Sequence, residues 1–287
     1  MKSTTSKLSI ICITLALSTH QGMAASVVAY AFTGEGNEMF LNTLGTSGST
    51  TTPLQTVVGS GSSVHSLTGG GELGYSGQAS ATASYNSLRS AASGALTNSF
   101  YDSAYNYAES TGVPQTYASQ GTAEFTQTLL HGGTAVNYTS TYALHLTGTI
   151  SGNARAAVSI SLTHASNTPE TWFYDAVGNY DLMIYSQAYI HGAFAQDFSL
   201  SLNTLYSFGT TSLADGGDYS GAAAFGNTLE VVGIDIRDDS GRLIRQGTIS
   251  SDSGQSFNII SVPEPSTSVL AFLSAGFFLR RGRKHSL

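Results

Sequence analysis

The sequence holds few groups of residues whose types and spacing are suited to catalysis. A serine nucleophile on a sharp turn needs the pattern G-x-S-x-G, and the nearest stretch, Gly74-Tyr75-Ser76-Gly77, does not have it. The seven histidines are scattered without an H-E-x-x-H pair, which leaves zinc hydrolysis without a motif. His145 and His164 fall on expected strands, where surface or partly buried imidazoles are common. We therefore expect a non-enzymatic protein with no catalytic residue and no cofactor.

Two acidic clusters offer oxygen atoms of the kind that calcium binds. They are Asp215-Gly-Gly-Asp218 and Asp235-Ile-Arg-Asp238-Asp239. Neither follows the D-x-D-x-D-G order of a calcium loop, and turn formation and solubility explain both. Asp215, Asp218, Asp238 and Asp239 are thus weak calcium candidates, and the expectation is that no metal is bound.

A third group of carboxylates surrounds two aromatic residues. Glu170, Asp175 and Asp181 flank Trp172 and Tyr174, which makes them the best candidates for a carbohydrate-facing patch. Glycosidases need two convergent carboxylates, and one sequence does not show convergence. Trp172 is more readily explained as a core aromatic residue. A sheet face lined with Trp and Tyr would favour carbohydrate binding, whereas a flat face of Ser, Thr and small residues would count against it.

The elements that position these residues are expected to be β-strands, because apolar and polar residues alternate with a period of two. In Gln78–Asn86 the alternation places Ala79, Ala81, Ala83 and Tyr85 on one face. Three further stretches follow the same pattern: Tyr142–Thr147, Val158–Thr163 and Phe198–Leu202.

Turn residues lie between several of these segments. Ser151-Gly152-Asn153 and Asp238-Asp239-Ser240-Gly241 each predict a hairpin. Residues 42–63 are rich in Thr, Ser and Gly and indicate an exposed loop or a weak edge hairpin. Aromatic residues at helical spacing in residues 99–110 indicate a short helix or a loop with aromatic anchors.

Short strands and glycine-rich turns together predict an all-β protein built as an antiparallel β-sandwich. A jelly-roll-like form is the first choice, and a β-helix is the main alternative. No long linker interrupts the body, so we expect one passenger domain over residues 25–260.

The first 24 residues have the three parts of a secretory signal peptide. Two lysines precede a short apolar run, and small residues follow it before Ala25. We expect cleavage after Ala24, with Ala25 as the second choice, and export through the Sec machinery. The single cysteine, Cys12, lies inside this peptide, so the body has no disulfide.

The charge of the body excludes two classes of partner. Without the terminal segments, five arginines and no lysine face seventeen acids, which gives a net charge of about −12. Such a body repels nucleic acid phosphates and anionic lipid surfaces. We therefore expect no nucleic acid partner and no membrane-surface role for the body.

The last 27 residues, 261–287, combine three features in order. Pro263 and Pro265 keep the chain around Glu264 extended. A helix from Ser266 to Leu279 would be about 21 Å long, short of the roughly 30 Å hydrocarbon core. The basic residues that follow would hold this short anchor on the cytoplasmic side.

This tail resembles the PEP-CTERM sorting signal over about its last twenty-five residues. In that family an exosortase, a membrane-embedded cysteine protease of Gram-negative bacteria, recognises the signal. The resemblance implies that Pro263, Glu264 and Pro265 form the sorting motif and that the other two parts are a transmembrane anchor and a stop-transfer cluster. The implied anchor residues are Val269, Leu270, Phe272, Leu273, Gly276, Phe277, Phe278 and Leu279, and the implied stop-transfer residues are Arg280, Arg281, Arg283 and Lys284.

The resemblance implies transient anchoring in the inner membrane, followed by release to the outer envelope or extracellular matrix. Three stretches of the body also resemble passengers that precede such tails. The expected function is a non-enzymatic matrix or biofilm component associated with exopolysaccharide, with an exosortase as processing partner. The alternative is a carbohydrate-binding module or a weak polysaccharide-acting enzyme on a β-sandwich, whose partner is an extracellular polysaccharide.

Overall fold

A computed structural model describes most of residues 25–262. The described residues are 25–35, 38–47, 54–66, 72–98, 116–131, 137–153, 155–164, 168–190, 195–209, 217–244 and 249–262. The expected signal peptide, the tail from Pro263 onward, and the helix or loop expected over residues 99–110 lie outside this part.

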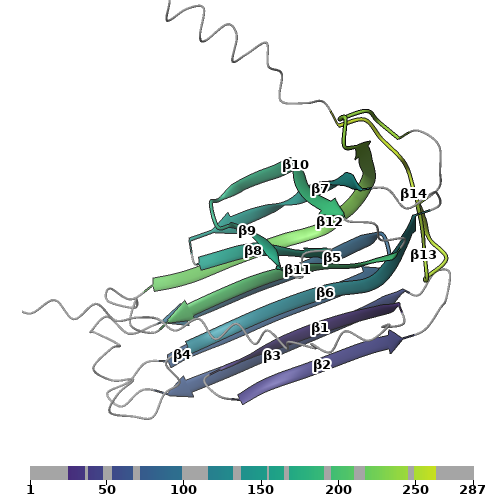
Figure 1. Cartoon of the computed structure of the whole chain (residues 1–287). Coiled ribbons are helices and arrows are strands. Elements are labelled where there is room, and N and C mark those ends of the chain that lie inside the picture. The colour runs from purple at the N-terminus through teal and green to yellow at the C-terminus, as the bar shows by residue number, and fades with distance from the viewer. Residues whose placement is uncertain are drawn as a thin grey trace, which may run out of the picture.

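Two antiparallel sheets account for the strands (Figure 1). The first sheet contains β1 (Ser26–Glu35), β2 (Glu38–Ser47), β6 (Thr116–His131), β8 (Arg155–His164), β9 (Glu170–Tyr174), β11 (Ala195–Gly209), β13 (Ile249–Ser251) and β14 (Ser256–Phe257). The second sheet contains β3 (Gln55–Ser66), β4 (Glu72–Ser84), β5 (Ser87–Asn98), β7 (Tyr138–Gly152), β10 (Gly178–Ile190) and β12 (Gly217–Asp238).

The predicted all-β, antiparallel sandwich is confirmed. Each of the four alternating segments lies on a strand and turns its apolar face inward. Ala79, Ala81 and Ala83 are buried on β4, and Val158, Ile160 and Leu162 are buried on β8. Tyr142, Leu144 and Leu146 are buried on β7, and Phe198, Leu200 and Leu202 on β11. Burial of these side chains is the main force that holds the two sheets together.

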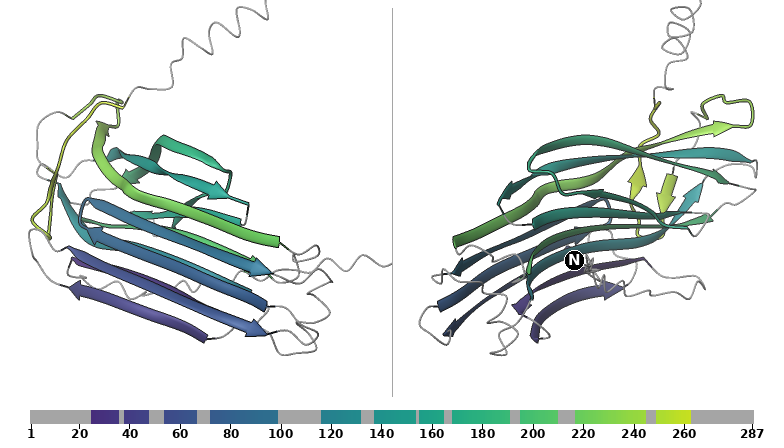
Figure 2. Two further views of the ribbon diagram at one scale, coloured as in Figure 1. Left: turned by 180° about the vertical axis from the view of Figure 1, so that it is seen from behind. Right: turned by 90° about the vertical axis from the view of Figure 1, so that its left-hand side faces the viewer.

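The sandwich is thinner where β1 and β6 face β3, β4 and β5 (Figure 2). Cα atoms of β1 come within 8 Å of Cα atoms in β3 and β4, closer than the roughly 10 Å between packed sheets. Small inward side chains allow this approach. A Cβ on Gly121 would lie only 2.3 Å from the carbonyl oxygen of Ser80 across the interface. Where β11 of the first sheet faces β7 and β12 of the second, large residues such as Tyr142, Phe198 and Phe225 fill the interior instead.

Buried hydroxyl groups lie between the two hydrophobic clusters of the interior. The Tyr75 hydroxyl lies 2.9 Å from Thr33 Oγ1 and 2.8 Å from Ser119 Oγ, and it donates to the Ala118 carbonyl. A second pair joins Ser90 Oγ and Thr204 Oγ1 at 2.6 Å, and Ser90 also donates to the Gly121 carbonyl. Because these hydroxyls bond to one another, their burial does not carry the penalty of an unsatisfied polar group.

The C-terminal segment, residues 249–262, crosses from one sheet to the other, and we call it the strap. β13 pairs with β6 in the first sheet. Ile259 then forms a parallel bridge with Ile234 of β12 in the second sheet. The strap therefore completes both layers at the same end of the sandwich, where the yellow ribbon of Figure 1 runs across the layers.

The hairpin predicted at Ser151-Gly152-Asn153 is wrong. β7 belongs to the second sheet and pairs with β10 and β12, whereas β8 belongs to the first sheet. Gly152 has a φ of +101°, which suits glycine, but this exposed turn carries the chain from the second sheet to the first. Asn153 ties the crossing to β12, because its Nδ2 donates to the Asp218 carbonyl and its Oδ1 accepts from the Ser220 amide.

The second predicted turn is confirmed. Asp238 Oδ1 accepts hydrogen bonds from the amides of Ser240 and Arg242, and Gly241 takes a φ of +79°. Leu243 returns to pair with Arg237. The hairpin is therefore short, and β13 lies in the other sheet.

An exposed loop or weak edge hairpin was expected over residues 42–63; outside residues 48–53, which lie beyond the described part, these residues form strands that do not pair with each other. Residues up to Ser47 belong to β2, and residues from Gln55 onward belong to β3. β2 pairs with β1 and β3 pairs with β4, in different sheets. The small polar side chains of β3 belong to an edge strand, where one face remains in water.

Candidate functional site

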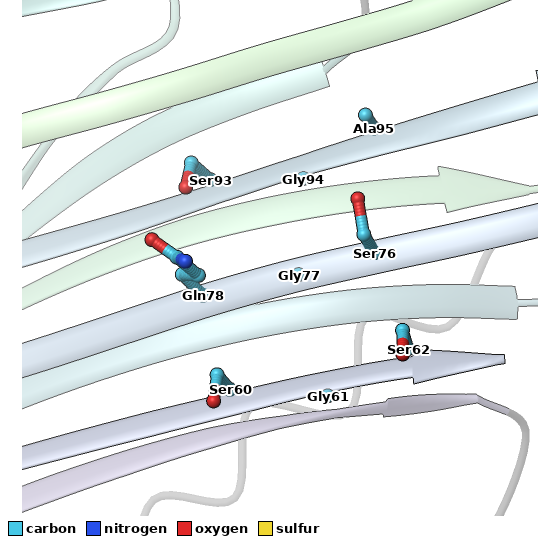
Figure 3. Close-up of a pocket in the computed structure, with 9 residues that line it drawn as sticks. All are labelled: Ser60, Gly61, Ser62, Ser76, Gly77, Gln78, Ser93, Gly94 and Ala95. Carbon is cyan, nitrogen blue, oxygen red and sulfur yellow. The ribbon is translucent and has the colours of Figure 1, made fainter.

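A shallow groove of about 590 Å³ crosses the outer face of the second sheet (Figure 3). Its lining residues are Ser60, Gly61, Ser62, Ser76, Gly77, Gln78, Ser93, Gly94 and Ala95, from β3, β4 and β5. Ser60, Gln78 and Ser93 are register partners and form one row of side chains. The glycines turn toward the interior, so the groove offers hydroxyl and amide groups and lacks titratable and aromatic side chains. This is the flat, small-residue face that counts against a carbohydrate platform at this place.

His164, Ser186 and Glu170 form the group of described residues that comes nearest to a hydrolytic triad. Nε2 of His164 lies 2.8 Å from Ser186 Oγ and 3.5 Å from Glu170 Oε1. A triad needs the hydroxyl and the carboxylate on opposite ring nitrogens, but here both approach the same one. His164 is only 2% exposed and its ring stacks on Tyr142 with centroids 5.4 Å apart. Burial lowers the pKa of His164 and Glu170 opposes that shift. These contacts describe a buried neutral histidine of the core.

The carboxylates around Trp172 are held apart by different partners. Glu170 on β9 faces His164, whereas Asp181 on β10 lies 2.6 Å from Nε2 of His145 on the outer face of the second sheet. Asp175 is exposed beyond the end of β9. The structure thus assigns Glu170 and Asp181 to different histidines and different sheets, which is not the arrangement of a glycosidase pair.

Trp172 and Tyr174 are half-buried and pack against the hydrophobic core. Tyr174 also meets Tyr180 edge to face, with ring centroids 5.6 Å apart. This placement agrees with the reading of Trp172 as a core aromatic residue. Phe173 points the other way and is exposed.

A row of exposed apolar and aromatic side chains instead follows the outer face of β10. Met183, Tyr185 and Tyr189 are 45%, 47% and 57% exposed. Tyr185 and Tyr189 stand four residues apart on one face, which is about 13 Å along a strand. Gln187 lies between them, opposite Thr141 of β7. The Tyr189 hydroxyl donates to Asp239 at 3.1 Å. We call Met183, Tyr185, Gln187 and Tyr189 the β10 row. Alternation in residues 178–190 is the sequence signal for this row, which was not among the predicted sites.

The calcium candidates act mainly in local structure. Asp238 holds the turn described above, and hydrogen bonds from Ser240 and Arg242 lower its pKa. Asp239 accepts from Tyr189, and Asp218 is exposed near the Asn153 crossing. Asp215 lies outside the described residues. Within the part of the chain that the structure describes, no group of three or more His, Cys, Asp or Glu side chains is placed to hold a metal ion.

A buried ion pair at the end of β12 was missed by sequence reasoning. Arg237 donates from Nε and Nη2 to the two carboxylate oxygens of Asp235, at 3.0 and 3.1 Å. Asp235 also accepts the backbone amide of Val262 at 2.7 Å, and Arg237 Nη2 donates to the Val262 carbonyl at 3.2 Å. We call Asp235 and Arg237 the clamp. The sequence shows Asp235 and Arg237 on one strand face. It does not show that the backbone of Val262, 25 residues beyond Arg237, is their partner.

The comparisons with known proteins leave the chain without an assigned family. Neither a protein-family model nor a curated protein sequence matches it. A solved structure of TmCBM61 in complex with β-1,4-galactotriose covers 67% of this chain and 92% of its own, with 7% identity and a TM-score of 0.20. A TM-score this low supports no argument about function.

The expected sorting motif, anchor and stop-transfer residues from Pro263 to Lys284 all lie outside the described residues, as does the residue before the expected signal cleavage, Ala24. Ala25 is the first described residue and is buried. In the described ranges, no helix has the length and hydropathy needed to cross a membrane.

Proposed function

We propose that the protein is an exported, non-enzymatic component of the cell envelope or extracellular matrix, delivered and processed through its C-terminal tail. The observation that carries this proposal is the clamp on Val262. The folded body holds this residue by both its backbone groups, and Pro263-Glu264-Pro265 follows at once in the sequence. A body that is held up to the residue directly before the proposed sorting motif supports the proposal that the residues beyond it serve as a processing signal.

The described surface supports a structural role over a catalytic one. The groove on β3, β4 and β5 is lined by Ser, Gly, Gln and Ala, and the buried histidine lacks the geometry of a general base with a nucleophile. The proposal includes the jelly-roll-like form of the sandwich, since β10, β11 and β12 alternate between the two sheets.

The test is to replace Pro263-Glu264-Pro265 with three alanines in a bacterium that carries an exosortase. We expect the variant to stay in the membrane fraction with its tail attached, while the unaltered protein appears outside as a shortened body. Mass spectrometry of both fractions measures the two C-termini. Unchanged release and an unchanged C-terminus in the variant would sink the sorting proposal.

A second candidate function, binding of a neutral polysaccharide, is favoured by the β10 row. Tyrosine rings combine an apolar face with a polar tip, and an exposed pair on one strand is suited to stack on sugar rings. Gln187 between them and Thr141 opposite supply hydrogen-bonding groups. The net negative charge of the body favours neutral over acidic polymers.

This second function is tested with the exported body and polysaccharide isolated from the same culture. In affinity electrophoresis, the double variant Tyr185→Ala/Tyr189→Ala should be retarded by the polysaccharide at least about tenfold less than the unaltered body, because two stacking contacts are removed together. A matched control is Phe173→Ala, an exposed aromatic residue on β9 in the other sheet. Equal retardation of the unaltered body, the double variant and Phe173→Ala would contradict carbohydrate binding by the β10 row.

A further inference from the structure

Only a short part of the strap pairs with the second sheet, and it makes few backbone hydrogen bonds there. Ile234 donates its amide to the Asn258 carbonyl at 2.9 Å, and Ile260 donates to the Ile234 carbonyl at 3.1 Å. The Ile260 side chain also fills the space over Gly233, where a Cβ would lie 2.6 Å from its Cγ2. Contacts on this scale are weak beside the long pairings of β12 with β5 and β7. The clamp adds the remaining contacts at the end of the strap.

Asp235 holds the strap from a buried position. It is 1% exposed although it lies on the outer face of β12, because Arg237 and the strap cover it. Its carboxylate receives three hydrogen bonds, two from Arg237 and one from the Val262 amide. A buried carboxylate is tolerated only when it is paired and hydrogen-bonded in this way. Arg237 also reaches the Gly241 carbonyl, which ties the hairpin after β12 to the same point.

The clamp recognises the backbone of Val262, not its side chain. It binds both the N–H and the C=O of this one residue, so it sets the position of the chain at Val262. The next residue is a proline, which has no N–H to continue a ladder of hydrogen bonds. Backbone pairing of the strap with β12 ends at Ile260, and the clamp extends the hold on the chain to Val262, the residue directly before the proline.

We propose that the Asp235–Arg237 clamp is the attachment that fixes where the C-terminal tail leaves the folded domain, so that the processing enzyme meets free chain only beyond Val262. This inference rests on the proposed sorting function. The clamp residues act as positioning residues, since they contact the base of the tail and not the bond that is cut. With the clamp broken, residues 258–262 leave β12 and become accessible to cleavage at further positions.

The experiment uses the full chain with Asp235→Asn or Arg237→Lys, and Glu230→Gln as the matched control. Asn keeps the shape of Asp without its charge, and Lys keeps the charge of Arg without its planar fork. Glu230 is an exposed carboxylate on the same strand. Hydrogen exchange of the Ile260 and Val262 amides and the intact mass of the released body are measured for each protein.

For both clamp variants we expect amide exchange at Ile260 and Val262 at least about tenfold faster, as suits the loss of a hydrogen bond to a charged group. We also expect released bodies with several C-termini upstream of Pro263, whereas the control keeps the exchange rates and the single C-terminus of the unaltered protein. Unchanged exchange in both variants overturns the attachment, and faster exchange with a single unchanged C-terminus overturns its role in processing. Failure of the sorting proposal shows separately, as normal release of the triple-alanine variant.

Discussion

The ring of Tyr206 lies directly on the backbone of Gly94. A Cβ placed on Gly94 would come within 2.2 Å of Cε1 and 2.5 Å of Cδ1 of this ring. Gly94 belongs to β5 in the second sheet and Tyr206 to β11 in the first, so the contact spans the interior. Tyr206 is fully buried, and burial raises its pKa to about 12. The glycine is thus what allows a tyrosine to fit between two closely spaced sheets.

Gly94→Ala should therefore destabilise the body. The added methyl group has to displace a buried ring, and overpacking of this kind costs about 1–3 kcal/mol. Urea unfolding followed by fluorescence measures the change. Gly226→Ala is the control, because nothing lies within 4 Å of a Cβ at that position on β12. Equal unfolding midpoints for the two variants would contradict the packing described for Tyr206.

Tyr75→Phe should lower stability through the loss of a single oxygen atom. Its hydroxyl joins Thr33, Ser119 and the Ala118 carbonyl inside the thin part of the sandwich. Removing it leaves Thr33 and Ser119 bonded to each other at 3.0 Å but takes a buried partner from both and from the Ala118 carbonyl, at a cost of about 1–3 kcal/mol. Tyr219→Phe, at a half-buried tyrosine on the edge of the same cluster, provides the comparison. A loss of stability no larger than that of Tyr219→Phe would mean that Tyr75 is held by packing alone.

The stability of the body should fall as the pH drops below about 6.5, the ordinary pKa of histidine. Burial lowers the pKa of His164, so the unfolded chain takes up a proton before the folded one does. Above the pKa of the unfolded histidine, His164 is neutral in both states and does not change the stability. Between that pKa and the lower pKa of the folded state, the free energy of unfolding decreases as the pH drops. Unfolding free energies at a series of pH values measure this slope. In His164→Gln the part of the slope due to this residue disappears, and identical slopes in both proteins would exclude His164 as its source.

The strap should depend on a buried serine. Ser253 donates to Gln127 of β6 at 2.8 Å and lies 2.6 Å from Ser251 Oγ, and Gln127 in turn donates to the Tyr85 carbonyl. Ser253→Ala removes the first two of these contacts and should cost about 1–3 kcal/mol, the penalty of an unsatisfied buried partner. Thermal unfolding compares it with Ser256→Ala on the exposed face of β14. A midpoint equal to that of Ser256→Ala would show that Gln127 finds another partner.

The sequence predicts the layers of this fold better than their connections. Alternating Ala79, Ala81 and Ala83 reveal an inward face, because a strand exposes every second side chain on each side. Turn residues such as Gly152 indicate only that the chain reverses. After such a turn the chain either pairs with the strand it has just left or crosses to the facing sheet. The outcome depends on which strand edges are already paired, and the residues of the turn do not indicate this. For this reason Asp238–Gly241 was predicted correctly as a hairpin and Ser151–Asn153 was not.

Contacts to backbone groups were the least predictable part of the candidate site. The clamp binds the amide and the carbonyl of Val262, which every residue except proline possesses, so the identity of Val262 carries no signal. The β10 row was readable in principle, since Met183, Tyr185 and Tyr189 share one strand face. Its exposure depends on β10 being an edge strand with its outer face uncovered, which is a property of the assembled sheet.

The strap also has a consequence for the timing of folding. Residues 249–262 are the last part of the body to be synthesised, and β6 and β12 both lack a partner along part of one edge until this segment arrives. A chain that is threaded through a membrane from its N-terminus thus reaches its complete hydrogen-bonded form only when Val262 has emerged. Up to that moment the body lacks these contacts and is less stable, which under the proposed export keeps the chain easier to unfold while it is being transported.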